Sequence, residues 1–533
     1  VLAYYLWIGA FEDALVVAES VRMLTRSDDV SPLLRINAAL LVGRLEWLTG
    51  SFAAARQTLE AALGLAQATG VHVFDHNLMG DAAAAALSDD DRAGARVWLG
   101  RLAGELPRMT RFARAYYHFL AGWDALLAGD VTTAIGEHET MQAATWESGM
   151  PALQCLADFF SAQALQAQHI AGADVHLSEA LESARRMGSR LFEFMSLLIE
   201  ADFALRRGDD GRALQVLARA MPIGRERGYL NTWLWSAPMM ADLAARALEA
   251  DIEVDYVRRL VRERRLVPRE PPVEVEQWPW PVKVFTLGRF EVVVGGHPVK
   301  FTGKAQKKPL ALLQALIALG GQGVREERLT EILWPDAEGD AAHQALSTTL
   351  HRLRRLIGHD RALQRHDGQI TLVPEHCWVD VRAIERMIGR AEAAIARSPV
   401  RDHEWSQSVR WTDRALALYQ GEFLTAHPTL PWAEAMGQRL KERLLRQLRR
   451  LGHLWEHIGD WDEAAECYER AVSINDCAEE FYRRLMVAYQ RLDRRGDAIL
   501  AYQRCRKALM AVLGVGTSPE TEALLKTIQS AEN

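Results

Sequence analysis

Four short segments with one common pattern recur in the first half of the chain, and they constrain its fold more than any other feature. Each has a turn that begins with glycine and leads into a helix that carries alanine. The segments are Gly9-Ala-Phe-Glu-Asp-Ala14, Gly50-Ser-Phe-Ala-Ala-Ala55, Gly129-Asp-Val-Thr-Thr-Ala134 and Gly208-Asp-Asp-Gly-Arg-Ala213. Glycine permits the tight turn and alanine lets a second helix approach closely, so the pattern predicts paired helices.

These segments resemble the inter-helix turns of tetratricopeptide repeats, although their spacing is nearer to about 40 residues than to the usual 34 or so. Residues 1–265 are therefore expected to form an irregular α-solenoid, and a looser resemblance to the sensor repeats of large regulators implies a sensory or regulatory role. Its inner face is a candidate site for a small-molecule or protein inducer. Tryptophan inside paired helices usually belongs to the core, but it can also line a ligand pocket. The candidates are Trp123, Trp146, Trp233 and Trp235.

A proline-rich stretch separates this region from the rest of the chain. Five prolines lie between Pro268 and Pro281, and each lacks an amide donor and favours extended backbone before it, so residues 266–281 are expected to form a linker. The pattern then changes to β-branched and aromatic residues from Val282 to Val294. Gly295-Gly296 predicts a hairpin turn into a strand over residues 297–301.

Three helices and a second hairpin follow these strands. Asp367-Gly368 predicts a two-residue turn within residues 362–373. Strands, three helices and a terminal hairpin in this order predict a winged helix-turn-helix over residues 282–380. The expected helices are residues 307–319, 326–333 and 341–357.

The last part of the chain is helical again and has a clear repeat. Ala464, Tyr468 and Arg470 recur 34 residues later as Ala498, Tyr502 and Arg504, which is the period of a tetratricopeptide hairpin. Residues 381–533 are therefore expected to be an all-α domain of this type. The predicted fold class is mainly α: an irregular α-solenoid, a central α+β winged helix-turn-helix and a C-terminal helical-repeat domain.

The third predicted helix of the winged helix has two distinct faces. Leu346, Leu350, Leu353 and Ile357 form one apolar stripe, which is expected to be buried. Arginine can bind guanine, glutamine can bind adenine, and threonine offers a hydroxyl and a methyl group, so the opposite face suits the major groove. A solvated helix face is the alternative. The candidate DNA-contacting residues are Gln344, Thr348, His351, Arg352 and Arg355.

Local charge favours DNA contact over a merely solvated face. Five arginines and one acidic residue lie between Ala341 and Arg365, although the whole chain has a net charge of −7, which argues against general binding to polyanions. Arg365 and His366 lie beside the predicted hairpin turn, where a wing could contact the minor groove or phosphate. Lysines at the start of the first helix could also meet phosphate; they are Lys304, Lys307 and Lys308.

Several motifs in the second half resemble a known family. Leu333-Trp-Pro-Asp-Ala337 and the run from Ala345 to Gly358 resemble the winged helix of antibiotic-regulatory (SARP-type) activators, which is related to the OmpR/PhoB-type fold. Four further motifs resemble the bacterial transcriptional activator domain: Tyr419-Gln-Gly-Glu-Phe-Leu424, Trp432-Ala-Glu434, Gly459-Asp-Trp-Asp-Glu-Ala464 and Gly514-Val-Gly-Thr-Ser-Pro-Glu-Thr521. The resemblance implies an activator that binds double-stranded promoter DNA and contacts RNA polymerase or a second protomer.

Two other functions are consistent with the sequence. One is a tetratricopeptide scaffold whose winged helix binds protein. The other is the coupling part of a large signal-transduction ATPase, because the solenoid loosely resembles the sensor repeats of such regulators. No GxxxxGK[ST] loop occurs, and Gly303-Lys304 lacks the first glycine. The sequence therefore predicts no enzyme, no cofactor and no metal site; Asp89-Asp90-Asp91 suits a helix N-terminus.

Composition bounds the remaining possibilities. Hydrophobic residues make up 49% and charged residues 25% of the 533 residues, and no apolar run approaches the roughly 18 residues that a membrane span needs. Five scattered cysteines without a CxxC pair fit the reducing cytoplasm. The first residue is Val1, with no secretory signal after it, so the chain is expected to be a truncated or excised part of a longer protein.

Overall fold

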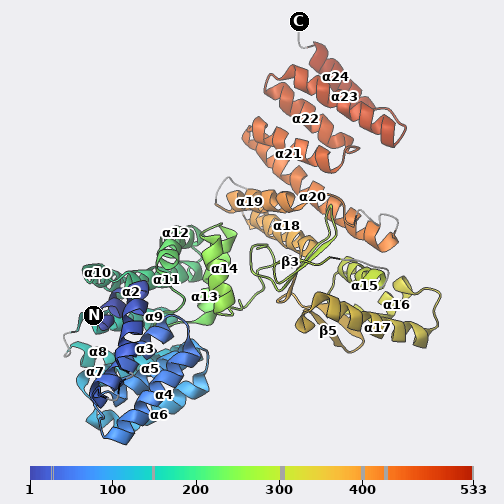
Figure 1. Ribbon diagram of the computed structural model, residues 1–533. Helices are drawn as coiled ribbons and strands as arrows, with labels where there is room; N and C mark the ends of the chain where they lie inside the picture. The colour runs from blue at the N-terminus through green and yellow to red at the C-terminus, as the bar shows by residue number, and fades with distance from the viewer. Residues whose placement is uncertain are drawn as a thin grey trace. The chain divides into compact units, whose positions relative to one another are not determined.

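The computed structural model describes two compact units, Val1–Pro272 and Val273–Asn533 (Figure 1). The side chains of residues 146, 403 and 404 are not described, so Trp146 is outside the description as a pocket residue, and Phe301 and Lys304 lie outside the described residues. No helix in the described ranges is long and apolar enough to cross a membrane. The described residues are 1–25, 27, 29–146, 150–300, 306–397, 403–424 and 430–530.

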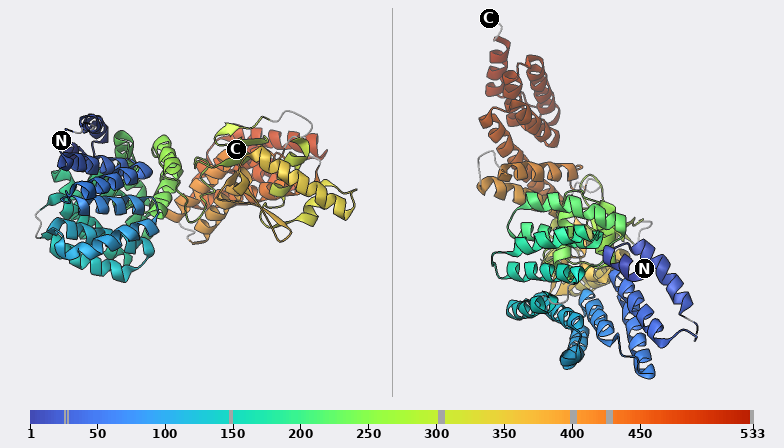
Figure 2. Two further views of the ribbon diagram at one scale, coloured as in Figure 1. Left: turned by 60° about the horizontal axis from the view of Figure 1, so that its bottom comes forward. Right: turned by 90° about the vertical axis from the view of Figure 1, so that its left-hand side faces the viewer.

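The described part of the first unit is built from α-helices, with one short 3-10 helix, η1 (Leu106–Arg108). From α3 onward, successive helices pair as hairpins, and Figure 2 shows these hairpins side by side in chain order. The helices are α1 (Leu2–Ile8), α2 (Phe11–Leu24), α3 (Pro32–Leu48), α4 (Phe52–Thr69), α5 (Asp75–Ser88), α6 (Arg92–Glu105), α7 (Arg111–Ala128), α8 (Val131–Trp146), α9 (Pro151–Ala167), α10 (Ala173–Arg186), α11 (Arg190–Arg206), α12 (Asp210–Arg227), α13 (Ala237–Glu249) and α14 (Val254–Glu263).

The glycine-to-alanine segments form the predicted turns between helices. Their glycines have φ values that only glycine adopts readily: Gly9 (77°), Gly50 (86°), Gly129 (72°) and Gly208 (75°). Their alanines have no exposed surface: Ala14, Ala55, Ala134 and Ala213. A larger side chain at these alanines would separate the packed helices, so the sequence pattern and the helical-repeat fold have the same physical cause.

An extended segment between α12 and α13 fills the interior of the first unit. Tyr229 Oη donates a hydrogen bond to the carbonyl of Gly9 (2.8 Å), and Trp233 stacks on Trp7 with ring centroids 5.6 Å apart. Trp123, Trp233 and Trp235 are each at most 2% exposed. Trp233 therefore belongs to the core, while Trp123 and Trp235 are buried and also line a cavity within this unit.

The expected linker over residues 266–281 is packed in its second half, which differs from the prediction. The indole Nε1 of Trp378 donates to the carbonyl of Val273 (2.7 Å), and Glu274 forms an ion pair with Arg390. Val275, Trp278 and Trp280 are each at most 5% exposed. The prolines set an extended backbone, but the two tryptophans carry apolar surface that is more stable against the second unit than in water. We call residues 273–281 the strap.

Two small sheets open and close the winged helix. β1 pairs antiparallel with β2 and parallel with β7, and the predicted Gly295-Gly296 turn joins β2 to β3. The first sheet has the order β3-β2-β1-β7 and the second β4-β6-β5. The strands are β1 (Val282–Phe285), β2 (Glu291–Val294), β3 (His297–Pro298), β4 (Val324–Arg325), β5 (Leu363–His366), β6 (Gln369–Leu372) and β7 (Cys377–Val379).

Three helices lie between β3 and β5 in the chain, close to the predicted ranges: α15 (Lys307–Ala318), α16 (Glu326–Leu333) and α17 (Gly339–Ile357). The short 3-10 helix η3 (Asp360–Ala362) then leads into the hairpin of β5 and β6. Its turn is Asp367-Gly368, with φ values of 47° and 69°, as the two-residue turn requires. The predicted winged helix-turn-helix order is therefore present.

The remaining helices form hairpins in which the two repeat alanines are buried. Ala464 and Ala498 have no exposed surface, and Tyr468 packs so closely on Gly452 that a Cβ atom there would lie 2.4 Å from its ring. The helices are α18 (Asp380–Arg397), α19 (His403–Leu418), α20 (Pro431–Ile458), α21 (Trp461–Ile474), α22 (Glu479–Arg491), α23 (Arg495–Val512) and α24 (Pro519–Ser530).

Candidate nucleic-acid interface

The two predicted faces of α17 are separated in the structure. The four residues of the apolar stripe are each at most 2% exposed: Leu346, Leu350, Leu353 and Ile357. The five candidate contact residues are all exposed: Gln344, Thr348, His351, Arg352 and Arg355. One side of α17 therefore holds the helix in the core of the winged helix, and the other side offers polar and basic groups to solvent.

The two exposed arginines of this face have no partner among the described residues. Arg352 and Arg355 make no hydrogen bond or ion pair there, whereas Arg354 Nη2 donates to the carbonyl of Leu363 (3.1 Å) and joins α17 to β5. Figure 1 shows α17 beside β5. Guanidinium groups without an internal partner keep all five N–H donors for a ligand. Arg352 and Arg355 are thus the basic groups of α17 that are open to an anion.

Charge is unevenly distributed along α17. Asp336, Glu338 and Asp340 are exposed at or just before its first turn, where acidic groups stabilise the positive end of the helix dipole. The same groups would repel phosphate at that end. The arginines lie in the second half of the helix, so phosphate contacts are expected there rather than at the first turn.

The structure gives Arg365 a role inside the protein. Its guanidinium donates to both carboxylate oxygens of Glu326 (2.5 and 2.7 Å) and to Ser347 Oγ (3.1 Å). Glu326 is only 3% exposed, and its hydrogen bonds raise the pKa of Arg365 above the ordinary value. Arg365 therefore fastens the wing to α16 and α17. Contact of Arg365 with DNA remains a prediction, and it would have to share the guanidinium with Glu326.

His366 and the candidate lysines have different surroundings. His366 is 85% exposed at the wing tip, where its Nδ1 lies 2.9 Å from Asp367. Lys308 Nζ donates to the carbonyl of Leu333 (2.8 Å) and lies 5.2 Å from the ring centroid of Trp334, so it stabilises the negative C-terminal end of α16. Lys307 is exposed. Lys304 lies outside the described residues.

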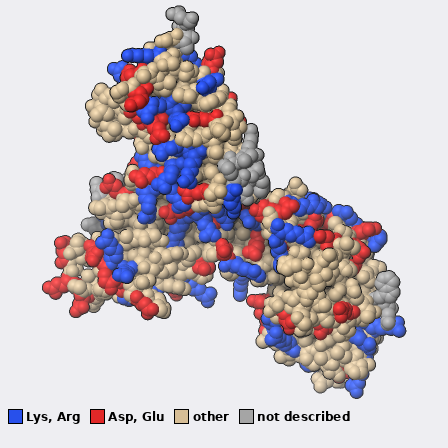
Figure 3. Space-filling model, turned by 180° about the vertical axis from the view of Figure 1, so that it is seen from behind, with Lys and Arg blue, Asp and Glu red and all other residues tan. Residues whose placement is uncertain are grey.

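Sequence reasoning missed a second basic surface, on α20. Within twelve residues this helix carries six basic side chains that are exposed or half-buried, of which Arg443 pairs with Glu392 and Arg449 with Glu480. Figure 3 shows Lys and Arg side chains gathered around the middle of the second unit on the face that it draws. The sequence signal for this surface is the close spacing of Lys and Arg residues within a predicted helical repeat. The six residues are Arg439, Lys441, Arg443, Arg446, Arg449 and Arg450.

A buried carboxylate joins the winged helix to the helices that follow it. Asp380, which begins α18, is 1% exposed and accepts hydrogen bonds from the amides of Thr286 (2.5 Å) and Leu287 (2.9 Å). Burial raises the pKa of Asp380, although these hydrogen bonds oppose the increase. The amide of Leu424 also donates to the carbonyl of Thr286 (2.8 Å). Displacing α18 from the first sheet would break these bonds together.

Comparison with known proteins finds one region of this chain that matches a family model. Residues 379–529, which include α18 to α23 and nearly all of α24, match the family model of the bacterial transcriptional activator domain. Residues 379–529 are thus similar to the activator domain whose motifs the sequence of the second half resembles.

Two relatives carry the name regulatory protein AfsR. The one from Streptomyces griseus is 26% identical over 237 residues, which are 44% of this chain and 23% of the relative. The one from Streptomyces coelicolor is 26% identical over 238 residues, 43% of this chain and 22% of the relative. The matched region is thus under a quarter of either relative's length. A solved structure, Mycobacterium tuberculosis EmbR in complex with low affinity phosphopeptide, is 22% identical and covers 48% of this chain and 66% of its own, with a TM-score of 0.36.

Proposed function

We propose that this chain binds double-stranded promoter DNA through the exposed face of α17 and thereby activates transcription. The observation that carries the proposal is the pair Arg352 and Arg355, exposed and without an internal partner on a helix whose other face is buried. A helix of this kind in a winged helix-turn-helix fits the major groove. Such a regulator works where promoter DNA is, in the cytoplasm, and the proposal includes no catalytic step.

Base reading and phosphate contact are expected to fall on different residues of α17. Gln344, Thr348 and Arg352 lie one or two turns apart along the exposed face, which is the spacing of side chains that follow a groove. Arg355 lies near the C-terminal end, away from the acidic first turn, and is suited to phosphate. His366 at the wing tip would add a contact outside the major groove.

The helices after the winged helix are proposed to contact RNA polymerase or a second protomer. The match to an activator domain supports this role. The basic surface of α20 offers Arg446 and Arg450, which have no partner among the described residues, to an acidic protein surface or to DNA beside the operator. Because Asp380 joins α18 to the first sheet, a partner bound to these helices would also bias the position of the winged helix.

The first unit is proposed to hold the inducer. It contains a cavity of about 390 Å³. The indole Nε1 of Trp235, one of the lining residues, is buried and has no hydrogen-bond partner among the described residues, so an inducer with an apolar body and one acceptor group would fit. The lining includes Trp123, Leu127, Gln163, Phe203, Arg206 and Trp235.

Selection of genomic DNA fragments by the purified protein tests the main proposal. The selected site should bind the parent chain tightly, and the double variant Arg352→Ala/Arg355→Ala should lose most of that affinity while staying folded. Arg219→Ala, an exposed arginine on α12 of the first unit, is the matched control and should bind as the parent does. A folded double variant with parental affinity would favour a scaffold whose winged helix binds protein.

A further inference from the structure

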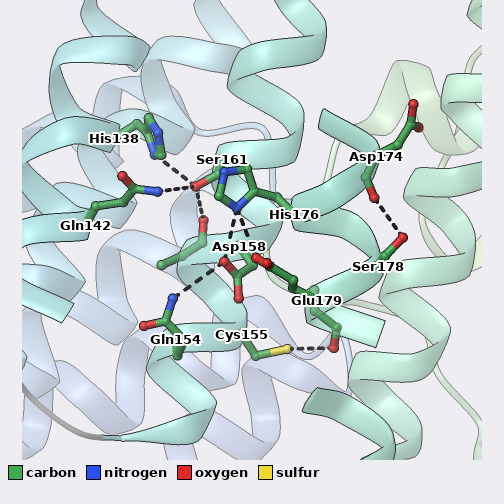
Figure 4. Close-up of polar contacts among 12 residues, drawn as sticks. His138, Gln142, Gln154, Cys155, Asp158, Ser161, Asp174, His176, Ser178 and Glu179 are labelled. Atoms are coloured by element: carbon green, nitrogen blue, oxygen red, sulfur yellow. Dashed lines mark hydrogen bonds and ion pairs between the residues drawn. The ribbon is translucent and has the colours of Figure 1, made fainter. Parts of the chain in front are cut away.

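Three side chains from two helices of the first unit meet at one point, as Figure 4 shows. His176 Nδ1 lies 3.3 Å from Asp158 Oδ1 and 3.6 Å from Glu179 Oε2. The three atoms all lie within 4.8 Å of one another. Such a meeting of one imidazole nitrogen and two carboxylate oxygens is a ligand set that several metal ions accept.

Local structure explains why these residues meet. His176 and Glu179 are three residues apart on α10, so they point from the same face of that helix. Asp158 is on α9, the preceding helix of the same hairpin, and Gly172 makes the turn with a φ of 109°. The cluster therefore bridges the two helices of one repeat.

The charge of Asp158 is compensated less well than that of any other buried acid among the described residues. Asp158 is 4% exposed, and within the described ranges its carboxylate receives only the imidazole of His176 and a 3.5 Å contact from Gln154 Nε2. Burial consequently raises the pKa of Asp158. A buried carboxylate without a cation is costly, so this position favours an added positive charge.

The other buried acids show what full compensation looks like. An arginine pairs with each of four of them, and Asp380 accepts hydrogen bonds from three backbone amides and a hydroxyl. Asp158 has no lysine or arginine partner in the part of the chain that the structure describes. The four arginine pairs are Asp81 with Arg44, Asp124 with Arg92, Glu274 with Arg390 and Glu326 with Arg365.

The distances fit a small transition-metal ion. Ligand atoms about 2.0–2.2 Å from Zn²⁺ in a tetrahedron lie roughly 3.3–3.6 Å from one another. The two distances from His176 Nδ1 match these edges. The third edge joins the carboxylate oxygens of Asp158 and Glu179, which lie within 4.8 Å of each other, and the exposed Glu179 side chain can move to close it. Imidazole nitrogen favours zinc and its neighbours over magnesium and calcium, which prefer oxygen ligands alone.

We propose that Asp158, His176 and Glu179 form a binding site for a divalent transition-metal ion, which ties α9 to α10. The side chain of Glu179 is 59% exposed, so the ion can enter from solvent and keep water on its open side. Behind the site, Ser161 Oγ lies 3.0 Å from His138 Nδ1 and donates to the carbonyl of Ala157 (2.7 Å), so His138 supports the wall rather than supplying a ligand.

The experiment titrates the chelator-treated full chain with ZnCl₂ by calorimetry and follows thermal unfolding in parallel. The parent should bind one more equivalent of Zn²⁺ than His176→Ala. Its first unit should also melt at a higher temperature with Zn²⁺, because a ligand that binds only the folded state stabilises it. Glu179→Gln, at an exposed position, should fold normally and weaken Zn²⁺ binding on the order of tenfold or more. Mg²⁺ and Ca²⁺ should not compete.

Matched controls distinguish this site from adventitious binding by surface groups. His169→Ala changes an exposed histidine in the turn between the same helices, and Glu182→Gln changes an exposed acid one turn along α10. Both should keep the parental stoichiometry and affinity. Co²⁺ should give the visible absorption of a four-coordinate ion in the parent and lose it in His176→Ala. Equal Zn²⁺ binding by the parent and His176→Ala would overturn the proposal, whatever the outcome for DNA.

Discussion

Arg352 and Arg355 lie three residues apart on the exposed face of α17, and they are expected to differ in what they contact. If Arg352 reaches a base edge, Arg352→Ala should cost about 1–3 kcal/mol on the selected site and relax the preference at one base pair. Arg355→Ala should weaken binding to all DNA sequences alike. It should also lower the slope of affinity against salt by roughly one unit, because one phosphate contact is lost.

Titrations of selected and unrelated DNA at several salt concentrations measure both effects. Leu350→Ala is the control for damage to the fold. Leu350 is 2% exposed, so its truncation should cost about 2–5 kcal/mol of stability and reduce binding only through unfolding. Equal losses on selected and unrelated DNA for both arginine variants would contradict the division of roles.

Arg365 is expected to matter for stability rather than for base reading. Arg365→Ala would leave the carboxylate of Glu326, which is 3% exposed, without its cation. We expect a loss of about 1–3 kcal/mol, below the value for a fully buried pair because the side chain of Arg365 is 40% exposed. Chemical unfolding of the second unit measures the loss. The double variant Glu326→Gln/Arg365→Gln should lose less than Arg365→Ala; an equal loss would mean that the ion pair does not set the stability.

His376 gives the second unit a stability that depends on pH. Burial lowers the pKa of His376 below the ordinary 6.5, and repulsion from His359, whose ring centroid is 4.9 Å away, lowers it further. The folded state therefore holds fewer protons than the unfolded state just below pH 6.5. Stability from this group is complete above about pH 6.5 and is lost as the pH falls toward the folded pKa. His376→Gln should melt with a smaller difference between about pH 7.5 and about pH 5.5 than the parent.

Exposure along α17 could be predicted from sequence, because a helical period assigns each residue to a face without knowledge of its neighbours. Partners could not be predicted in the same way. Arg365 meets Glu326, which is 39 residues earlier in the chain, and Lys308 meets the carbonyl of Leu333. Both contacts depend on how separate elements pack. The Asp158, His176 and Glu179 cluster was missed for the same reason, since its residues show no metal-binding spacing along the chain.

At the scale of elements, the 34-residue repeat sets how α21 packs on α20 and how α23 packs on α22. Ala464 and Ala498 have no exposed surface, so a leucine at either position would overfill a close helix crossing at a cost of about 1–3 kcal/mol. Ala464→Leu should lower the melting temperature of the second unit. Ala435→Leu, at an exposed position of α20, should leave it nearly unchanged. If both variants melt like the parent, the helices do not cross at Ala464.

Local patterns predicted the helices and the β5–β6 hairpin because their signals lie within a few residues. Asp367-Gly368 adopts the positive φ values that a two-residue turn needs. The pairing of β7 with β1 is different, because β7 has only three residues and joins a strand nearly a hundred residues away. In the strap, a local signal gave a prediction that the structure does not bear out. Its prolines indicated a linker, whereas Trp278 and Trp280 decided that it packs.

At the scale of the whole molecule, the two units have separate cores and separate proposed tasks. The match to the activator domain lies wholly in the second unit, and the proposed inducer cavity and metal site lie in the first. Regulation therefore needs a change in the first unit to alter the second. If the two units are not coupled, a ligand that binds one unit should leave the stability of the other unchanged. The change in the unfolding of one unit when a ligand binds the other therefore measures the coupling.

The strap gives a sharp test of where the second unit begins. Fragments 273–533 and 282–533 differ only in residues 273–281, so the shorter one lacks the buried Val275, Trp278 and Trp280. Burial of such side chains contributes about 1.5–3 kcal/mol each. The shorter fragment would also leave Arg390 without Glu274 and the indole Nε1 of Trp378 without the Val273 carbonyl.

We expect fragment 273–533 to fold cooperatively and bind the selected DNA with the affinity of the full chain. Fragment 282–533 should unfold at a clearly lower denaturant concentration, because several kcal/mol of burial are lost. Trp278→Ala in the longer fragment should reproduce part of that loss, since one of the buried indoles is removed. Urea unfolding followed by circular dichroism measures all three. Coincident unfolding curves for the two fragments would mean that residues 273–281 act as the flexible linker that their prolines suggest.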